Sequence, residues 1–380
     1  MDNLNFSAAA GDTPPPLSPP PIIAPPLPPR KGWGWMIAAI VLMVFLAFSL
    51  LGNLTQFFVN ALSFSPAFHT EAFGSAREFG PKLEECILEN NKSANKIAVI
   101  TVDGIITSHS LDGSGYNMVD VIAGQLDRAR NDKHVKAVLL KVDSPGGEVL
   151  ASDDIYKKIR AFQTDSKKPV ICSMGSLAAS GGYYISSASR WIVANELTIT
   201  GSIGVIMHGW NYRGLMDKVG VAPMTFKSGK FKDMLSGERE PSEIPPEERA
   251  MVQSLIDETY GKFKDVVADG RSAAHEQNKK EGKALVETWA DLADGRVISG
   301  KEALANGFVD ELGDFDDAVD RAEKLAHISD SNLVEYRERY DLSNFLSLFG
   351  QSGKAHDIKL DLGIEAPQLR AGYLYFLYQP

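Results

Sequence analysis

"VKAVLLKVDSPGG" occupies residues 135–147, "DDIYKKIRAFQTDS" residues 153–166 and "KPVICSMG" residues 168–175. The first and third segments are apolar runs, which are typical of buried strands, and the second has apolar residues at helical spacing. A strand, a helix and a strand in this order predict a right-handed crossover between parallel strands. We therefore expect an α/β fold with a largely parallel sheet and flanking helices.

The same alternation continues on both sides of this segment. Further strands are predicted at 96–106, 190–195 and 204–209, and further helices at 118–132 and 246–270. Gly270 is expected to follow the end of the last helix, and residues 297–313 predict a turn, a short helix and a final strand. The pattern indicates one domain over residues 96–330, with a C-terminal extension at 331–380.

Composition excludes some classes of protein. The chain has 380 residues and a net charge of −10, with 49 acidic and 39 basic residues, which argues against a nucleic-acid partner. The two cysteines, Cys86 and Cys172, match no zinc or iron–sulfur spacing. A disulfide between them is one alternative. Cys172 lies in an apolar run, which favours a buried small side chain.

The N-terminal part of the chain differs from the rest. Residues 1–31 contain "TPPPLSPPPIIAPPLPPR", which predicts a disordered or polyproline II tail that acts as a spacer or as a docking site. Residues 32–54 are apolar over a length that spans a bilayer, and Arg30 and Lys31 precede them, so we expect one transmembrane helix with a cytoplasmic N-terminus. A cleaved signal peptide is the alternative. Residues 55–95 are expected to form a stalk.

Within that stalk, "PKLEECILENNKSAN" (81–95) suggests a short helix. The far end of the chain has an uncharged aromatic tail, "AGYLYFLYQP" (371–380). This tail could add a strand at the edge of a groove or enter the active site of a neighbouring subunit. It could also pack on the core of its own subunit.

Two glycine-bearing turns follow neighbouring strands and suggest chemistry. "SLAASGGYY" (176–184) places Ser180 after an apolar strand and before two glycines. Ser180 is either a nucleophile or part of a tightly packed turn. "DSPGG" (143–147) ends the preceding strand. Because ligands bind at the carboxyl ends of parallel strands, the turns can converge, and the N–H groups of Gly147 and Gly181 could form an oxyanion hole.

A nucleophilic serine also needs a base. None of the seven histidines lies in these turns. A lysine can replace histidine when it is neutral, and burial favours that form. "FKSGKFKDMLSGEREP" (226–241) contains Lys227, Lys230 and Lys232, among which spacing does not choose.

Five co-linear motifs carry a resemblance to a known family. They are "VKAVLLKVDSPGG", "SLAASGGYYISSAS", "TITGSIGV", "KSGKFKDMLS" and "GRVISGKEALANGFVDELG", and they lie in residues 96–315. In this order and spacing the chain resembles bacterial signal peptide peptidase A, also called protease IV, in its short single-repeat form. The resemblance implies a crotonase/ClpP-like fold and a Ser–Lys dyad, with no metal or other cofactor.

Matched motif by motif, the resemblance assigns roles to residues of this chain. It implies that Ser180 is the nucleophile, Lys232 the general base and Ser202 the residue that orients the lysine amine. Gly147 and Gly181 correspond to the oxyanion-hole glycines.

The resemblance also implies a function and a setting. The expected activity is endopeptidase cleavage of hydrophobic peptides, chiefly remnant signal peptides. The expected assembly is a homo-oligomeric ring whose neighbouring subunits share active sites. The expected location is the bacterial inner membrane, with the catalytic domain on the periplasmic side. The alternatives are a crotonase-like acyl-CoA enzyme and a non-enzymatic membrane scaffold.

Overall fold

The computed structural model describes residues 34–63, 80–109, 116–338 and 374–377. The chain divides into two compact units, residues 1–78 and residues 79–380. The predicted proline-rich tail at 1–31 lies outside the described residues. So does most of the predicted C-terminal extension.

The helix expected at residues 32–54 is present as α1, Gly34–Ser63. Its described side chains include a run of exposed apolar residues between Ile40 and Leu51. Within the described part of the chain, no helix meets the length and apolarity required to cross a membrane. The helix is therefore confirmed, but its transmembrane character is not.

The second unit is built on a mixed sheet whose central strands are all parallel. In the described residues the sheet has nine strands, with the path β1-β11-β2-β3-β5-β6-β10 and with β7 and β9 attached beside β5. Their bounds are Leu83–Glu89 (β1), Asn332–Glu338 (β11), Lys96–Asp103 (β2), Val135–Ser144 (β3), Val170–Ala179 (β5), Trp191–Ala194 (β6), Glu311–Leu312 (β10), Ile199–Gly201 (β7) and Val297–Ser299 (β9). From β11 to β10 each neighbouring pair is parallel.

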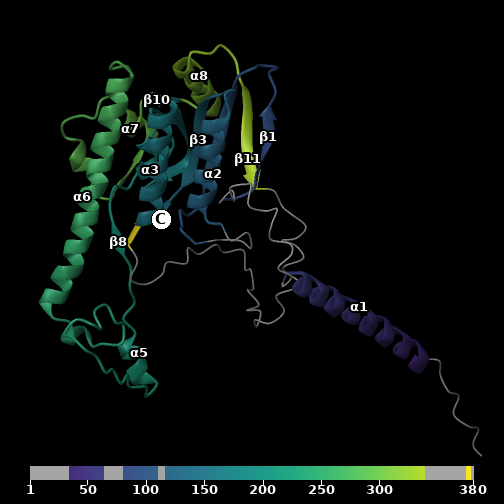
Figure 1. The fold of residues 1–380 in the computed structure, drawn as a ribbon. Coiled ribbons are helices and arrows are strands. Elements are labelled where there is room, and N and C mark those ends of the chain that lie inside the picture. Colours follow the sequence, from purple (N-terminus) through teal and green to yellow (C-terminus); the bar gives the residue numbers. More distant parts are fainter. Residues whose placement is uncertain (1–33, 64–79, 110–115, 339–373, 378–380) are drawn as a thin grey trace, which may run out of the picture. The chain divides into compact units, whose positions relative to one another are not determined.

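Helices cover both faces of this sheet, as the apolar runs predict. Alternate residues of a strand point to opposite faces. In β2, Ala98 and Ile100 join the larger core, which includes residues of α2, α3, α4 and α6. Ile97 and Val99 join a smaller core with α8. Figure 1 shows α2 and α3 beside β3, with α8 at the upper end of the sheet. The predicted α/β fold with a largely parallel sheet and flanking helices is confirmed.

The helices keep the order that the sequence predicts. Their bounds are Met118–Asn131 (α2), Val149–Ser166 (α3), Gly181–Ser186 (α4), Arg213–Lys218 (α5), Pro246–Gln277 (α6), Gly300–Ala305 (α7) and Phe315–Ala326 (α8), with 3₁₀ turns at Pro241–Glu243 (η2) and Trp289–Leu292 (η3). The turn, short helix and strand predicted at 297–313 are present as β9, α7 and β10.

The helix expected at 81–95 is wrong, because the chain forms the edge strand β1 there. β1 pairs antiparallel with β11, and Leu83 lies opposite Glu338. Local sequence gives a charged segment such as "LEECILE" no clear preference, and the pairing partner, far along the chain, imposes the extended form. Both cysteines are free, which excludes the disulfide in the described fold. Burial raises the pKa of the Cys172 thiol to about 12.

The end expected for α6 at Gly270 is also wrong. The helix continues to Gln277. Gly270 lies inside it and packs against Ser187, the residue that follows α4. A Cβ at Gly270 would lie 2.2 Å from the carbonyl oxygen of Ser187, so glycine is required by close packing. The next residue, Arg271, is fully buried and forms a 2.6 Å ion pair with Asp310. Asp310 directly precedes β10 and also accepts the N–H of Ile192 in β6, so the pair fixes α6 to these two strands.

The strand expected at 204–209 is shorter than predicted and is not part of the large sheet. Residues Ile206–Met207 form β8, which joins a second, three-stranded sheet in the described residues, with the order β4-β12-β8. β4 is Gly146–Glu148 and β12 is Leu374–Leu377. Figure 1 shows the yellow C-terminal strand next to β8, below α3. Residues 374–377 of the aromatic tail are therefore a strand of this small sheet.

Candidate active site

Ser180 lies where β5 ends and α4 begins. The residue is buried, and its φ of 55° places the backbone in the left-handed region that residues other than glycine rarely adopt. Two 2.8 Å hydrogen bonds hold it there: its N–H donates to the Gly201 carbonyl, and its carbonyl accepts from the Tyr184 N–H. A strained residue held in this way at a strand end favours a functional role over simple packing.

The two glycine-bearing turns meet beside Ser180, as the sequence predicts. A Cβ at Gly181 would lie 3.0 Å from the nitrogen of Gly147 and 3.1 Å from the Cα of Gly146. A Cβ at Gly146 would lie 2.6 Å from the nitrogen of Gly181. Glycine is required because backbone approaches backbone here. The structure thus brings together both predicted oxyanion donors.

The pairing of β4 sets the direction of the Gly147 N–H. Ile106 donates its N–H to the Gly146 carbonyl (2.9 Å) and accepts the Glu148 N–H at its own carbonyl (2.8 Å). Successive residues of an extended strand direct their N–H and C=O groups to alternate sides. Gly147 therefore directs its N–H away from Ile106, toward β12, where Phe376 is its pairing partner. The group therefore faces the strand that lies in this position, which is β12 in the described chain.

The strand β12 fills a groove between β4 and β8. It pairs antiparallel with both, and Phe376 is fully buried. The Phe376 ring centroid lies 4.9 Å from that of Tyr184, four residues after Ser180, and 4.6 Å from that of Phe263. Residues 374–377 of the tail therefore pack on the core of their own subunit, and they pair as a strand between β4 and β8 rather than at an edge.

Ser202 lies next to Ser180. β7 pairs with β5 so that Gly201 is opposite Ala179, and the two serines are the residues that follow this pair. Ser202 also has a left-handed φ, 51°, and its N–H donates to the carbonyl of Arg296 (2.7 Å). The structure thus places the predicted orienting serine beside the predicted nucleophile.

Lys232 is not brought to this cluster within the single chain. It lies in the turns between α5 and η2, and its side chain is exposed. Figure 1 shows α5 well apart from the sheet. Lys227 pairs with Asp233 at 2.7 Å and Lys230 approaches Glu247 at 3.8 Å. No ion pair of Lys232 occurs among the described residues. The neighbouring lysines are therefore engaged with carboxylates, and Lys232 remains available.

Glu148 is a residue near the site that the sequence did not single out. It directly follows Gly147, and its carboxylate accepts hydrogen bonds from Thr107, Ser108 and His109. No local spacing signals this cluster, because the donors lie about forty residues earlier in the chain.

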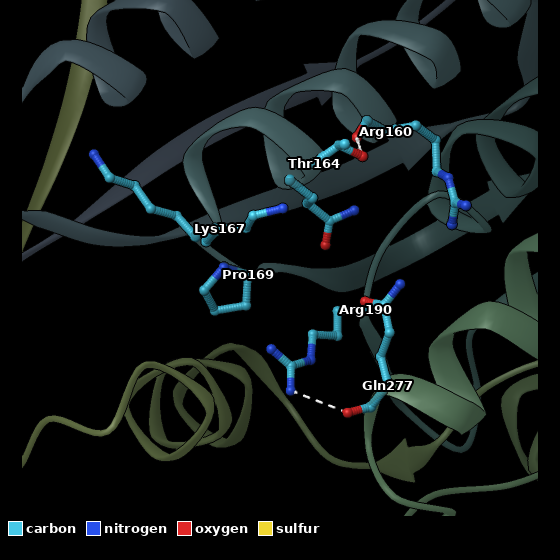
Figure 2. Close-up of a pocket in the computed structure, with 8 residues that line it drawn as sticks. Arg160, Thr164, Lys167, Pro169, Arg190 and Gln277 are labelled. Carbon is cyan, nitrogen blue, oxygen red and sulfur yellow. Dashed lines mark hydrogen bonds between the residues drawn. The ribbon is translucent and has the colours of Figure 1, made fainter.

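A basic pocket of about 370 Å³ lies at the opposite end of β5 (Figure 2). Its cations are Arg160, Lys167, Lys168 and Arg190. The Lys168 amine donates to three backbone carbonyls at the end of α2, and Arg190 donates to the side chain of Asn278. Since Ser180 follows the carboxyl end of β5, this pocket is separate from the candidate active site.

Comparisons with known proteins agree with this geometry. Residues 162–329 match the model of peptidase family S49. A signal peptide peptidase SppA from Enterococcus faecium is 38% identical over 270 residues, which is 70% of this chain and 73% of that protein. Protease 4 of Haemophilus influenzae is 36% identical over 65% of this chain and 38% of its own length.

A plant relative extends the comparison. The chloroplastic serine protease SPPA of Arabidopsis thaliana is 34% identical over 68% of this chain and 37% of its own length. The residues that match the family model include Ser180, Gly181, Ser202 and Lys232. The chain belongs to peptidase family S49, with the signal peptide peptidase SppA and protease 4 proteins, and is a serine-type peptidase.

Proposed function

We propose that this peptidase is a membrane-anchored endopeptidase in which Ser180 attacks the substrate and Lys232 is the base. The observation that carries the proposal is the meeting of Gly147 and Gly181 beside the strained Ser180. Two backbone N–H groups at such a point stabilise the oxyanion of a tetrahedral intermediate. The sheet that brings them together is inferred to be of the crotonase/ClpP-like kind.

The proposed reaction has two stages. Neutral Lys232 accepts the proton of the Ser180 hydroxyl as the oxygen attacks the peptide carbonyl. The carbonyl oxygen becomes the oxyanion between Gly147 and Gly181. The lysine proton then passes to the leaving amine as the C–N bond breaks. Water, deprotonated by the same lysine, attacks the carbonyl carbon of the acyl-enzyme. The ester C–O bond then breaks, and the lysine proton returns to the Ser180 oxygen. Ser202 orients the lysine amine.

The proposal requires a second subunit. Lys232 is exposed in the single chain, and burial is what favours a neutral lysine. The surrounding segment also exposes large apolar side chains: Trp210 is 76%, Met224 82% and Phe226 89% exposed. Such side chains favour burial against another protein surface. We infer a homo-oligomeric ring in which Lys232 of one subunit meets Ser180 of its neighbour.

Hydrophobic peptides, chiefly remnant signal peptides, are the proposed substrates. A peptide that adds as a strand between β4 and β8 gains main-chain hydrogen bonds, and side-chain pockets then give specificity. The apolar contacts of Phe376 with Tyr184 and Phe263 support an apolar side chain in this position. In this proposal β12 occupies the groove in place of substrate.

Deletion of residues 371–380 should therefore improve substrate binding. Because β12 belongs to the same chain, it competes with substrate for the groove at an effective concentration of about a millimolar. We therefore expect deletion to lower KM for a hydrophobic peptide about tenfold, with kcat little changed. Phe376→Ala should act in the same direction, and Phe376→Leu, which keeps an apolar side chain, should act less. Unchanged KM in a variant that circular dichroism shows to be folded would assign β12 to core packing alone.

The proposed location is the bacterial inner membrane, with a single pass, a cytoplasmic N-terminus and a periplasmic catalytic unit. Support comes from the exposed apolar side chains of α1 between Ile40 and Leu51 and from the basic residues Arg30 and Lys31 before them. Alkaline carbonate extraction of membranes tests this: the anchored protein should stay in the pellet. Release into the supernatant would refute the anchor.

An acyl-CoA enzyme would use the same pair of backbone donors on a thioester. Purified protein should therefore be offered a synthetic signal peptide and, separately, an acyl-CoA. We expect peptide fragments from the first, identified by mass spectrometry, and no turnover of the second. Thioester turnover without peptide cleavage would favour the acyl-CoA alternative, and no turnover of either would favour the membrane scaffold.

A further inference from the structure

The Glu148 carboxylate hydrogen-bonds to residues 107–109 beside the candidate oxyanion site. It accepts hydrogen bonds from the Thr107 hydroxyl (3.1 Å) and from the Ser108 N–H (3.0 Å) and hydroxyl (2.5 Å). It also contacts His109 Nδ1 at 2.9 Å. The Glu148 side chain is only 10% exposed. One buried carboxylate thus binds three successive residues.

These bonds fix the backbone that orients Gly147. Ile106 directly precedes residues 107–109 and forms a parallel β-bridge with Gly147. It hydrogen-bonds to Gly146 and Glu148, the residues on either side of Gly147. Gly146 and Gly147 have no side chains to limit their rotation, and Gly146 has a φ of 100°. Neighbouring strands must therefore hold the direction of the Gly147 N–H.

One of those neighbours leaves during catalysis. Under the proposed function, β12 gives way to substrate, so the pairing of Phe376 with Gly147 is not permanent. The pairing with Ile106 then remains as the fixed edge of β4. Its stability depends on the anchoring of residues 107–109 to Glu148.

The charge state of Glu148 is consistent with this role. Burial alone would raise the pKa of the carboxyl, but the hydrogen bonds from Ser108, Thr107 and His109 outweigh burial and hold the pKa below its usual value. The group therefore remains an acceptor for all its donors at neutral pH. Removing the carboxylate leaves these donors without their acceptor, which frees or displaces the segment.

We propose that Glu148 is a positioning residue for the oxyanion site, which acts through Ile106 on the direction of the Gly147 N–H. The inference rests on the proposed function. A donor misplaced by about 1 Å costs about 10²-fold in rate. We therefore expect Glu148→Ala to lower kcat by about 10- to 100-fold, with KM changed less than about twofold.

The test compares two inhibitors built on one hydrophobic peptide, an aldehyde and the corresponding alcohol. With the aldehyde, the serine oxygen bonds to the carbonyl carbon, the serine proton passes to the base, and the former carbonyl oxygen occupies the oxyanion site. The alcohol makes the same side-chain contacts without that oxygen. Glu148→Ala should weaken the aldehyde by the factor lost from kcat and leave the alcohol unchanged.

Glu311→Ala is the matched control. Glu311 accepts hydrogen bonds from Trp191 and Arg321 at the far edge of the sheet, and its loss should leave the aldehyde-to-alcohol ratio as in the wild type. If Glu148→Ala fails to fold, Thr107→Val and Ser108→Ala each remove a donor and should lower the ratio in part.

The outcomes separate this inference from the proposed function. A wild-type protein that neither cleaves the peptide nor binds the aldehyde more tightly than the alcohol overturns the proposed function. A wild-type protein that does both, with an unchanged ratio in folded Glu148→Ala, overturns the role of Glu148.

Discussion

Replacing Ser180 with alanine is expected to lower peptide cleavage at least about 10⁴-fold, because in the proposed mechanism the substitution removes the attacking oxygen and leaves only binding and the oxyanion donors. Ser180 is buried, and its side chain caps no N–H of α4. Its loss should therefore cost little folding stability. The rate should be measured by chromatography of a cleaved hydrophobic peptide, with circular dichroism as the check on folding.

Ser176→Ala provides the matched control. It makes the same chemical change four residues earlier in β5, at an exposed position, and should keep wild-type activity. Substantial cleavage by Ser180→Ala would mean that another group attacks the substrate.

Lys232→Ala should lower the rate about 10²- to 10⁴-fold, the range that a general base contributes. Lys230→Ala is its control, since Lys230 lies in the same segment and approaches Glu247. The control should retain activity if Lys232 is the base. Equal losses in both variants would point instead to damage of the whole segment.

Mixing the two inactive variants tests whether subunits share the dyad. Ser180→Ala and Lys232→Ala chains should be co-purified with different tags after subunit exchange. If Lys232 of one subunit serves Ser180 of the next, about a quarter of the sites in a random ring regain both groups, and activity should recover to about that fraction. No recovery in verified mixed rings would place both residues of the dyad in one chain.

The sequence predicted the elements whose signals are local. Apolar runs marked β2, β3 and β5, and helical spacing marked α2 and α3. The convergence of the glycine turns followed from parallel topology, because the carboxyl ends of neighbouring parallel strands share one edge.

The features that the sequence did not predict depend on distant partners. β1 is extended because β11 pairs with it, and Gly270 serves a contact with Ser187 rather than ending α6. Pairwise contacts between remote segments leave no periodic pattern. For the same reason the sequence did not predict the hydrogen bonds of Glu148, although this residue directly follows Gly147.

The site was predictable in part. Ser180, Ser202, Gly147 and Gly181 follow paired strands, so their proximity comes from the sheet itself. Lys232 is in a segment outside the sheet, and the structure of one chain leaves it exposed. Its proposed role as the base depends on a neighbouring subunit, which local sequence does not describe.

Covalent labelling of the native protein tests the central claim most directly. The protein should be treated with a fluorophosphonate that carries a hydrophobic peptide, and the labelled residue should be mapped by mass spectrometry of tryptic fragments. The account expects one adduct per chain, on Ser180, formed in step with loss of peptidase activity. Loss of activity with Ser180 unmodified, or with the adduct on another residue, would contradict it.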